Sequence, residues 1–116
     1  MPTFERWSIV KVPFPYTDQM TKQRRPALVV ATGADLSAPH VLWAMMITSA
    51  ENRGWTGDIP VTDIRLAGLP APSVIRTAKV ATLDAQDVDL LGMLSDADRL
   101  AVRRCLTRIL GLENQA

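Results

Sequence analysis

The chain has 116 residues, with 13 lysines and arginines against 12 aspartates and glutamates, and a formal net charge of +1. This length suits one domain and is too short for a catalytic domain joined to a regulatory one. Because the charge is nearly balanced, a polyanion could be bound only by a local cluster of cations. One cysteine, Cys105, excludes an internal disulfide, and one histidine, His40, leaves no cluster at zinc spacing. We therefore expect no metal site.

Targeting signals are not recognisable in the sequence. Residues 1–6 lack the basic segment and apolar core of a signal peptide. No apolar run approaches the roughly 18 residues that span a bilayer. We therefore expect a soluble cytoplasmic protein without a membrane partner.

The first apolar segment, residues 9–12, predicts a β-strand that ends at Pro13, because proline has no N–H to donate to a strand ladder. The segment that follows, residues 16–23, is polar, shows no period and is too long for a tight hairpin. We interpret it as a mobile flap between the first and second strands.

Two arginines stand immediately before the second predicted strand, residues 26–31. The proline that opens this strand biases Arg25 toward extended backbone, so Arg24 and Arg25 mark its start. Considered alone, such a pair also fits solvated charges that flank a strand. The third predicted strand, residues 41–47, ends at Thr48. Since neighbouring strands of a meander run antiparallel, we expect Arg25 to lie close to Thr48.

The middle of the chain alternates short β segments with turns. A proline at position 60 makes the first segment an edge strand or no strand. Many short strands in a small chain predict a β-barrel. The predicted strands here are residues 59–61, 73–76, 79–83 and 90–94, and the predicted loops are residues 33–39, 50–57 and 68–72.

The last part of the chain changes to a helical period. Ser95, with Asp98 three positions on, fits an N-cap, and Gly111 ends the run. An apolar stripe predicts that this helix packs on the barrel. Four arginines dominate its other face, and we interpret them as solvated surface rather than as a nucleic-acid reader. The stripe consists of Leu100, Ala101, Val102, Leu106, Ile109 and Leu110, and the arginines are Arg99, Arg103, Arg104 and Arg108.

Three residues that often carry chemistry are interpreted as structural. His40 falls in a turn away from the arginine and threonine positions, so we do not expect an acid–base role despite its suitable pKa range. Cys105 is expected to be buried as a small hydrophobe. Trp43, in the third strand, is expected in the core or in a dimer interface.

Five motifs in the same order make the sequence resemble the MazF/PemK family of bacterial toxins, the ribonuclease components of toxin–antitoxin pairs. Each motif is weak alone, but together they cover nearly the whole chain. The resemblance implies a mainly β fold with a C-terminal helix, an SH3-like partly open barrel over residues 1–116, a homodimer, and no cofactor. The motifs are residues 12–18, 22–30, 47–49, 68–69 with 72–76, and 92–94.

The resemblance also implies metal-independent, sequence-selective cleavage of single-stranded RNA, restrained by a cognate antitoxin with an acidic and apolar tail. The family's functional arginine and threonine fall on Arg25 and Thr48. A guanidinium fork and a hydroxyl donor suit the two non-bridging oxygens of one phosphate while the RNA 2′-hydroxyl attacks it. Loop aromatic side chains would stack with unpaired bases. Further residues expected to contact RNA are Phe14, Tyr16, Asp18, Lys22, Arg24, Ser49, Trp55, Ser73, Arg76 and Lys79.

Two alternatives remain open. Where the family often has an acidic residue and glutamine followed by Ile-Arg, this chain has Ala78, Lys79, Val80 and Ala81. Lys79 offers a point charge for phosphate in place of a carboxamide. The two alanines leave open a degenerate toxin that retains only antitoxin binding. Because a fold does not fix function, a non-catalytic module such as a gyrase-poisoning toxin on the same barrel is also open.

Overall fold

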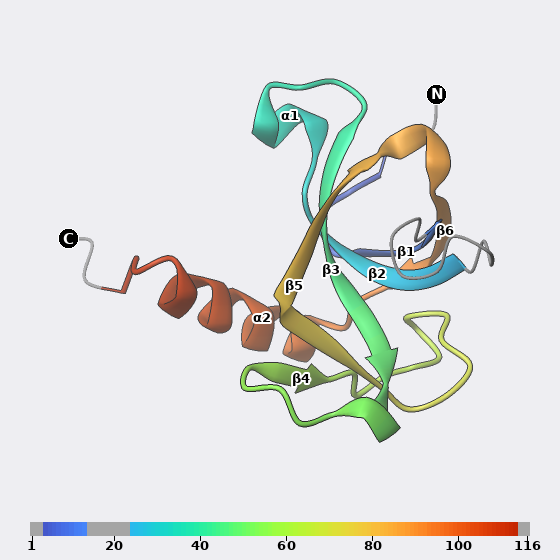
Figure 1. The fold of residues 1–116 in the computed structure, drawn as a ribbon, viewed down its shortest axis with the longest axis vertical. Coiled ribbons are helices and arrows are strands. Elements are labelled where there is room, and N and C mark those ends of the chain that lie inside the picture. The colour runs from blue at the N-terminus through green and yellow to red at the C-terminus, as the bar shows by residue number, and fades with distance from the viewer. Residues whose placement is uncertain (1–3, 14–23, 114–116) are drawn as a thin grey trace.

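The computed structural model describes residues 4–13 and 24–113. Six strands form one antiparallel sheet in the order β4-β5-β3-β2-β1-β6, and the sheet curls without closing, as Figure 1 shows. This arrangement confirms the predicted mainly β fold with a C-terminal helix and a partly open barrel. The elements are β1 (Ser8–Pro13), β2 (Arg24–Ala31), α1 (Gly33–Leu36), β3 (Val41–Ser49), η1 (Ala50–Asn52), β4 (Asp58–Pro60), β5 (Ser73–Asp84), η2 (Ala85–Asp87), β6 (Asp89–Met93) and α2 (Asp96–Ile109).

The strand predictions hold with one correction, in β5. The two strands predicted at residues 73–76 and 79–83 are a single strand. Opposite it on β3, Met46 pairs with Arg76, but the next residue, Met45, pairs with Val80. Residues 77–79 therefore form a bulge, which interrupts the alternation of side chains without ending the strand. The edge-strand interpretation of the segment around Pro60 is confirmed, because β4 lies at one end of the sheet.

One predicted loop contains a short helix, α1. Its first turn is capped by the carboxylate of Asp35, which accepts hydrogen bonds from the Thr32 N–H at 2.9 Å and the Thr32 hydroxyl at 3.1 Å. These bonds, together with Arg6 at 2.9 Å, hold the pKa of Asp35 below its ordinary value. The sequence did not indicate this element because four residues are too few to show a helical period.

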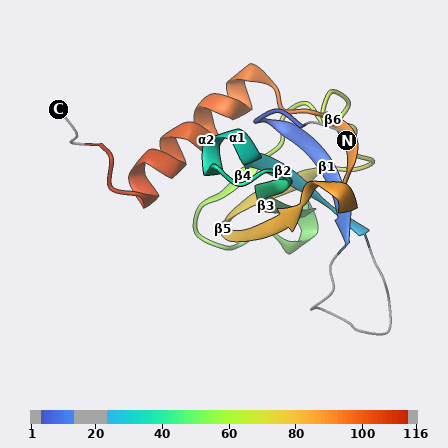
Figure 2. The ribbon, with the colours of Figure 1, turned by 90° about the horizontal axis from the view of Figure 1, so that it is seen from above.

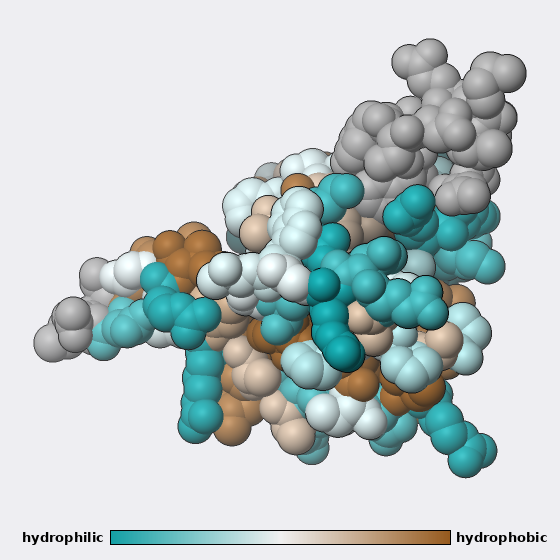
Figure 3. Space-filling view, turned by 60° about the horizontal axis from the view of Figure 1, so that its bottom comes forward, coloured by the Kyte–Doolittle hydropathy of each residue, from teal (hydrophilic) through white to brown (hydrophobic). Residues whose placement is uncertain are grey.

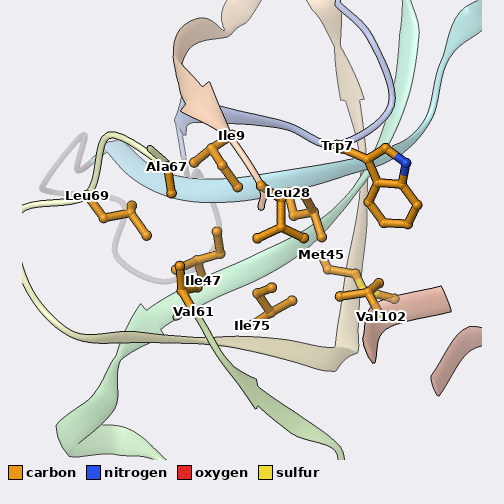
Figure 4. Close-up of a cluster of buried hydrophobic side chains, with 11 residues drawn as sticks. Trp7, Ile9, Leu28, Met45, Ile47, Val61, Ala67, Leu69, Ile75 and Val102 are labelled. Atoms are coloured by element: carbon orange, nitrogen blue, oxygen red, sulfur yellow. The ribbon is translucent and has the colours of Figure 1, made fainter. Parts of the chain in front are cut away.

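Two apolar clusters lie on opposite faces of the sheet, as strand alternation requires. Figure 4 shows the first cluster, which the N-terminal part of α2 and the segment after β4 cover. The second cluster is covered by the segment around η2. The first cluster comprises Trp7, Ile9, Leu28, Met45, Ile47, Val61, Ala67, Leu69, Ile75, Leu94 and Val102, and the second comprises Val10, Val12, Ala27, Val29, Leu42, Ala44, Met46, Ala81, Ala85 and Val88.

Helix α2 begins as predicted, with the Ser95 hydroxyl accepting a hydrogen bond from the Asp98 N–H. The buried carboxylate of Asp98 turns to the segment after β4, where it accepts from the Thr62 N–H at 2.8 Å and the Thr62 hydroxyl at 3.0 Å. Val102 and Cys105 are buried, which confirms the expectation for the cysteine. The helix thus fastens an irregular segment to the sheet.

The predicted apolar stripe of α2 is only partly buried. The helix extends past the sheet, as Figure 2 shows, so its last turn does not pack on the strands. Leu100, Ile109 and Leu110 are 47%, 53% and 63% exposed, which contradicts their prediction as packing residues. Apolar side chains accordingly gather at the end of the helix in the space-filling view (brown, at the left of Figure 3).

Trp43 is also exposed, at 45%, which contradicts the core alternative of its prediction and leaves the dimer interface as a prediction. Trp43 pairs with Thr82 and its neighbour on the same face of β3, Met45, pairs with Val80. Trp43 and the exposed Val80 are therefore diagonal neighbours on one face of the sheet. Within the described residues, no helix is long and apolar enough to cross a membrane.

Candidate functional site

Arg25 and Thr48 lie on the same face of two neighbouring strands. The antiparallel pairing of β2 with β3 is confirmed, and its ladder ends at Ala27 opposite Met46. Arg25 and Thr48 each lie two residues beyond this pair, so alternation places both on the face of the second apolar cluster. Pro26, which lacks an N–H, separates Arg25 from the ladder, and the two strands part beyond it (Figure 1). Arg25 and Thr48 thus lie on one face, at the end of the β2–β3 ladder where the two strands separate.

A buried ion pair stands on the same face, next to Thr48. Arg76 pairs with Met46 across β3 and β5, and with Asp58 across β4 and β5. Its Nε donates to Asp58 Oδ1 at 3.2 Å and its Nη2 donates to Oδ2 at 3.0 Å, with the two side chains 11% and 8% exposed. The Arg76 guanidinium is the main reason that the pKa of Asp58 lies below its ordinary value of 3.8, in spite of burial, which raises it.

Short hydrogen bonds connect this ion pair to Thr48. The Nη2 of Arg76 also donates to the main-chain oxygen of Asn52 at 2.6 Å, and the side-chain amide of Asn52 donates to Thr48 Oγ1 at 3.1 Å. Asn52 is the last residue of η1, whose N-cap Ser49 accepts from the Glu51 N–H. The end of β3 is therefore tied to β5 through one turn of 3₁₀-helix.

Trp55 offers an exposed aromatic surface beside this network. The guanidinium carbon of Arg76 lies 4.3 Å from the centre of the ring, within the range of a cation–π contact. The main chain is held as well, because the N–H groups of Gly54 and Trp55 both donate to Asp58 Oδ2 at 3.3 Å. With 52% of its surface exposed, Trp55 is placed to stack with a planar group.

Other sequence-predicted residues are not brought into this cluster. Arg24 is engaged elsewhere, because it pairs with Asp89 of β6 at 2.6 Å and donates to the main-chain oxygen of Asp87 in η2. Ser73 is buried, and its hydroxyl donates to the oxygen of Ala71. Lys79 lies in the bulge of β5 and is partly buried. Four predicted contacts lie outside the described residues: Phe14, Tyr16, Asp18 and Lys22.

The sequence interpretation missed Asn52 and Asp58. Asp58 lies 18 positions before Arg76 in the sequence, and Asn52, whose main chain Arg76 also contacts, lies 24 positions before it. Only the pairing of β4 with β5 and the turn after β3 bring them together. Among the described residues, no three or more histidine, cysteine, aspartate or glutamate side chains are grouped so that they could hold a metal ion.

This fold, a curled and partly open six-stranded sheet with a C-terminal helix, is shared with solved MazF structures. A chain of the MazE–MazF complex from Deinococcus radiodurans matches with a TM-score of 0.74 at 21% identity, over 96% of this chain and 98% of that one. The toxin MazF-mt6 of Mycobacterium tuberculosis matches with a TM-score of 0.68 at 18% identity, over 90% and 96%. A mycobacterial endoribonuclease in complex with its cognate antitoxin matches with a TM-score of 0.70 at 18% identity, over 96% of both chains.

The sequence decides which family the chain belongs to. The family model of the PemK-like, MazF-like toxins of type II toxin–antitoxin systems matches residues 5–110. The chain therefore belongs to this toxin family, which confirms the resemblance. No curated protein matches the sequence significantly.

Proposed function

We propose that this protein is a sequence-selective endoribonuclease toxin that cleaves single-stranded RNA without a metal ion. The RNA 2′-hydroxyl attacks the adjacent phosphorus, which yields a 2′,3′-cyclic phosphate and a 5′-hydroxyl. The carrying observation is that Arg25 and Thr48 lie on one face of the neighbouring strands β2 and β3, each two residues beyond the last pair of their ladder. Family membership supports the proposal, and the substrate implies a cytoplasmic location.

The reaction needs few groups from the protein, because the nucleophile is the 2′-hydroxyl of the RNA itself. Negative charge builds on the non-bridging phosphate oxygens, and fixed donors aimed at them are the main source of rate. Arg25 supplies a planar fork that binds two oxygens, and Thr48 supplies a third donor. We assign Arg25 to electrostatic stabilisation rather than to base catalysis, because a guanidinium with a pKa above about 12 is a poor base near neutral pH. Trp55 would receive an unstacked base.

The test is cleavage of a randomised single-stranded RNA pool and its all-DNA counterpart in the presence of EDTA, with the new ends identified by mass spectrometry. We expect RNA cut to cyclic phosphate and 5′-hydroxyl ends, and DNA left intact because it lacks the 2′-hydroxyl. Arg25→Ala and Thr48→Val should each lower kcat by about 100- to 1,000-fold, the loss for one such donor. The matched control is Arg104→Ala, an exposed arginine of α2, which should cleave like the wild type.

Undiminished cleavage by Arg25→Ala would refute the assigned mechanism. No cleavage of any RNA by the wild type would favour the degenerate toxin. That alternative draws on Ala81, which is buried in the second cluster opposite Ala44, where it presents no polar group to RNA.

We propose a cognate antitoxin as the protein partner. Two of the solved structures that match this fold, from Deinococcus radiodurans and from a mycobacterial species, are complexes of toxin and antitoxin. An acidic and apolar tail would suit a face that presents Arg25 and the exposed ring of Trp55. Such an antitoxin and a non-cleavable RNA should compete for binding to the wild type. Loss of this competition in Trp55→Ala would support the proposal that both ligands bind the face that carries Trp55.

We also propose a homodimer. The exposed apolar neighbours Trp43 and Val80 form a patch on the sheet face opposite Arg25. Such a patch is what an interface between copies would bury. Light scattering should give twice the chain mass for the wild type and the chain mass for Trp43→Glu, with Trp55→Glu, an equally exposed tryptophan, as the control. A monomeric wild type at micromolar concentration would contradict this assignment.

A further inference from the structure

We propose that Asn52 is a positioning residue for Thr48, which fixes the direction in which the Thr48 hydroxyl donates its proton. The inference rests on the proposed function, because it assigns a partner to the hydroxyl that is proposed to bind the scissile phosphate. It concerns a residue that the sequence interpretation did not select and that would not itself contact RNA.

The argument begins with the hydrogen-bonding capacity of a threonine hydroxyl, which has one proton to donate and two lone pairs that accept. The side-chain amide nitrogen of Asn52 lies 3.1 Å from Thr48 Oγ1 and can only donate to it. One lone pair of Thr48 is therefore directed toward Asn52, and the hydroxyl proton must point elsewhere. The inferred direction is toward the face that Thr48 shares with Arg25, where the phosphate is proposed to bind.

The second step is that Asn52 is itself held. Its main-chain oxygen accepts from the Nη2 of Arg76 at 2.6 Å, and Arg76 is fixed in turn by two bonds to the buried carboxylate of Asp58. A donor on an exposed turn would otherwise sample many orientations and contribute little. The ion pair thus keeps the amide of Asn52 aimed at Thr48 before any substrate binds, which is the preorganisation that transition-state stabilisation needs.

The direction of the hydrogen bond between Asn52 and Thr48 can be tested with two substitutions at position 52. They should differ in activity if this bond orients the Thr48 hydroxyl, and should not differ if the contact only stabilises the turn. In Asn52→Asp the carboxylate has no proton to donate, so the Thr48 hydroxyl turns and donates to it. That proton can then no longer be donated to the phosphate. We therefore expect kcat to fall by about 100-fold, close to the loss in Thr48→Val. In Asn52→Leu the hydroxyl is merely unfixed, and we expect a loss of about three- to ten-fold, the worth of one neutral hydrogen bond.

Both losses should appear in kcat, with KM for RNA nearly unchanged, because the hydroxyl acts on charge that develops in the transition state. Arg53→Gln is the matched control for charge. It lowers the charge of the same turn by one unit, as Asn52→Asp does, and should change kcat less than two-fold apart from any effect on RNA binding. Circular dichroism and thermal unfolding of each variant would detect a loss of fold.

A double-mutant cycle measures how far the effects of substitutions at Asn52 and Thr48 on kcat depend on each other. In a Thr48→Val background neither Asn52 variant should lower kcat further, since no hydroxyl remains to be directed. Equal losses for the Asp and Leu variants, or the same losses without the Thr48 hydroxyl, would overturn the inference while leaving the proposed function intact. Full activity of Asn52→Asp would also overturn it, because Asn52 would then be accepting from Thr48. A wild type that cleaves no RNA, or a fully active Thr48→Val, would instead overturn the proposed role of Thr48 and the inference with it.

Discussion

The ion pair between Arg76 and Asp58 gives the sharpest test of how this face of the sheet is held. Arg76→Met removes the two bonds to Asp58, the 2.6 Å bond to the oxygen of Asn52 and the cation–π contact with Trp55. Breaking a buried pair by removing one partner costs about 3–5 kcal/mol, because the other charge stays buried. The Asp58 carboxylate keeps two N–H donors, so we expect about 3 kcal/mol of lost unfolding free energy at pH 7.

The same variant makes a prediction about pH. In the wild type, the pKa of Asp58 is lowered in the folded state, so its contribution to stability is present above the ordinary value of 3.8 and is lost as the pH falls through the folded value. Without the Arg76 guanidinium, the largest cause that lowers the pKa of Asp58 is gone, and burial, which raises it, is opposed only by the N–H groups of Gly54 and Trp55. Acidification should therefore destabilise the variant less than the wild type. The cost of the substitution should be smaller at pH 3 than at pH 7.

Urea unfolding followed by far-ultraviolet circular dichroism at pH 7 and pH 3 measures both quantities. Arg65→Met, which removes an exposed arginine, should cost less than about 0.5 kcal/mol at either pH. Arg76→Lys should lose less unfolding free energy than Arg76→Met but more than the exposed control. Its ammonium keeps the positive charge but cannot form the two parallel hydrogen bonds that the guanidinium donates to Asp58. A cost under 1 kcal/mol for Arg76→Met at pH 7, or one that does not change with pH, would refute the reasoning.

Three further substitutions test the packing that supports the site, each by chemical denaturation at pH 7. Asp98→Ala removes two bonds to Thr62 and should cost about 2–4 kcal/mol, whereas a cost below 1 kcal/mol would mean that the segment after β4 is held by other contacts. Gly92→Ala would place its Cβ against the main-chain oxygen of Leu66 and should cost about 3 kcal/mol, so a neutral result would contradict the close approach of β6 to that segment. Leu28→Ala, at a fully buried position of the first cluster, should cost about 2–5 kcal/mol, and a smaller loss would indicate a core that collapses around the cavity.

Much of the fold could be predicted from the sequence, because the strands are short apolar runs bounded by prolines, glycines and polar turns. The start of β2 follows from the proline after Arg25, and the N-cap of α2 follows from Ser95. The errors have a common cause, which is that periodicity does not report what lies opposite a residue. The stripe of α2 continues through Leu110, but the sheet ends before the helix does. Trp43 sits in an apolar run, yet its face of the sheet is uncovered there.

The candidate site was predictable only where it depends on strand pairing. That Arg25 and Thr48 belong to one face follows from antiparallel neighbours, which is a local rule of meanders. The network around Arg76 follows no such rule. Asp58 and Asn52 have no sequence pattern that sets them apart from other turn residues. The sequence predicts Arg76 only as a contact to RNA, and its pairing with a buried carboxylate could be found only from the three-dimensional structure.

The place of β1 in the sheet bears on when this protein can become active during its synthesis. Ser8 pairs with Met93, and the Leu94 N–H donates to the oxygen of Trp7 at 2.9 Å, so the first strand made has one edge that only the last strand can fill. The first apolar cluster is likewise incomplete until Val102 of α2 has been synthesised. Pairings this distant in sequence form late, after their loop-closure entropy has been met. A chain whose synthesis has not reached β6 and α2 therefore lacks a closed core beneath the strands that carry Arg25 and Thr48, and we expect the proposed cleavage of RNA to require both elements.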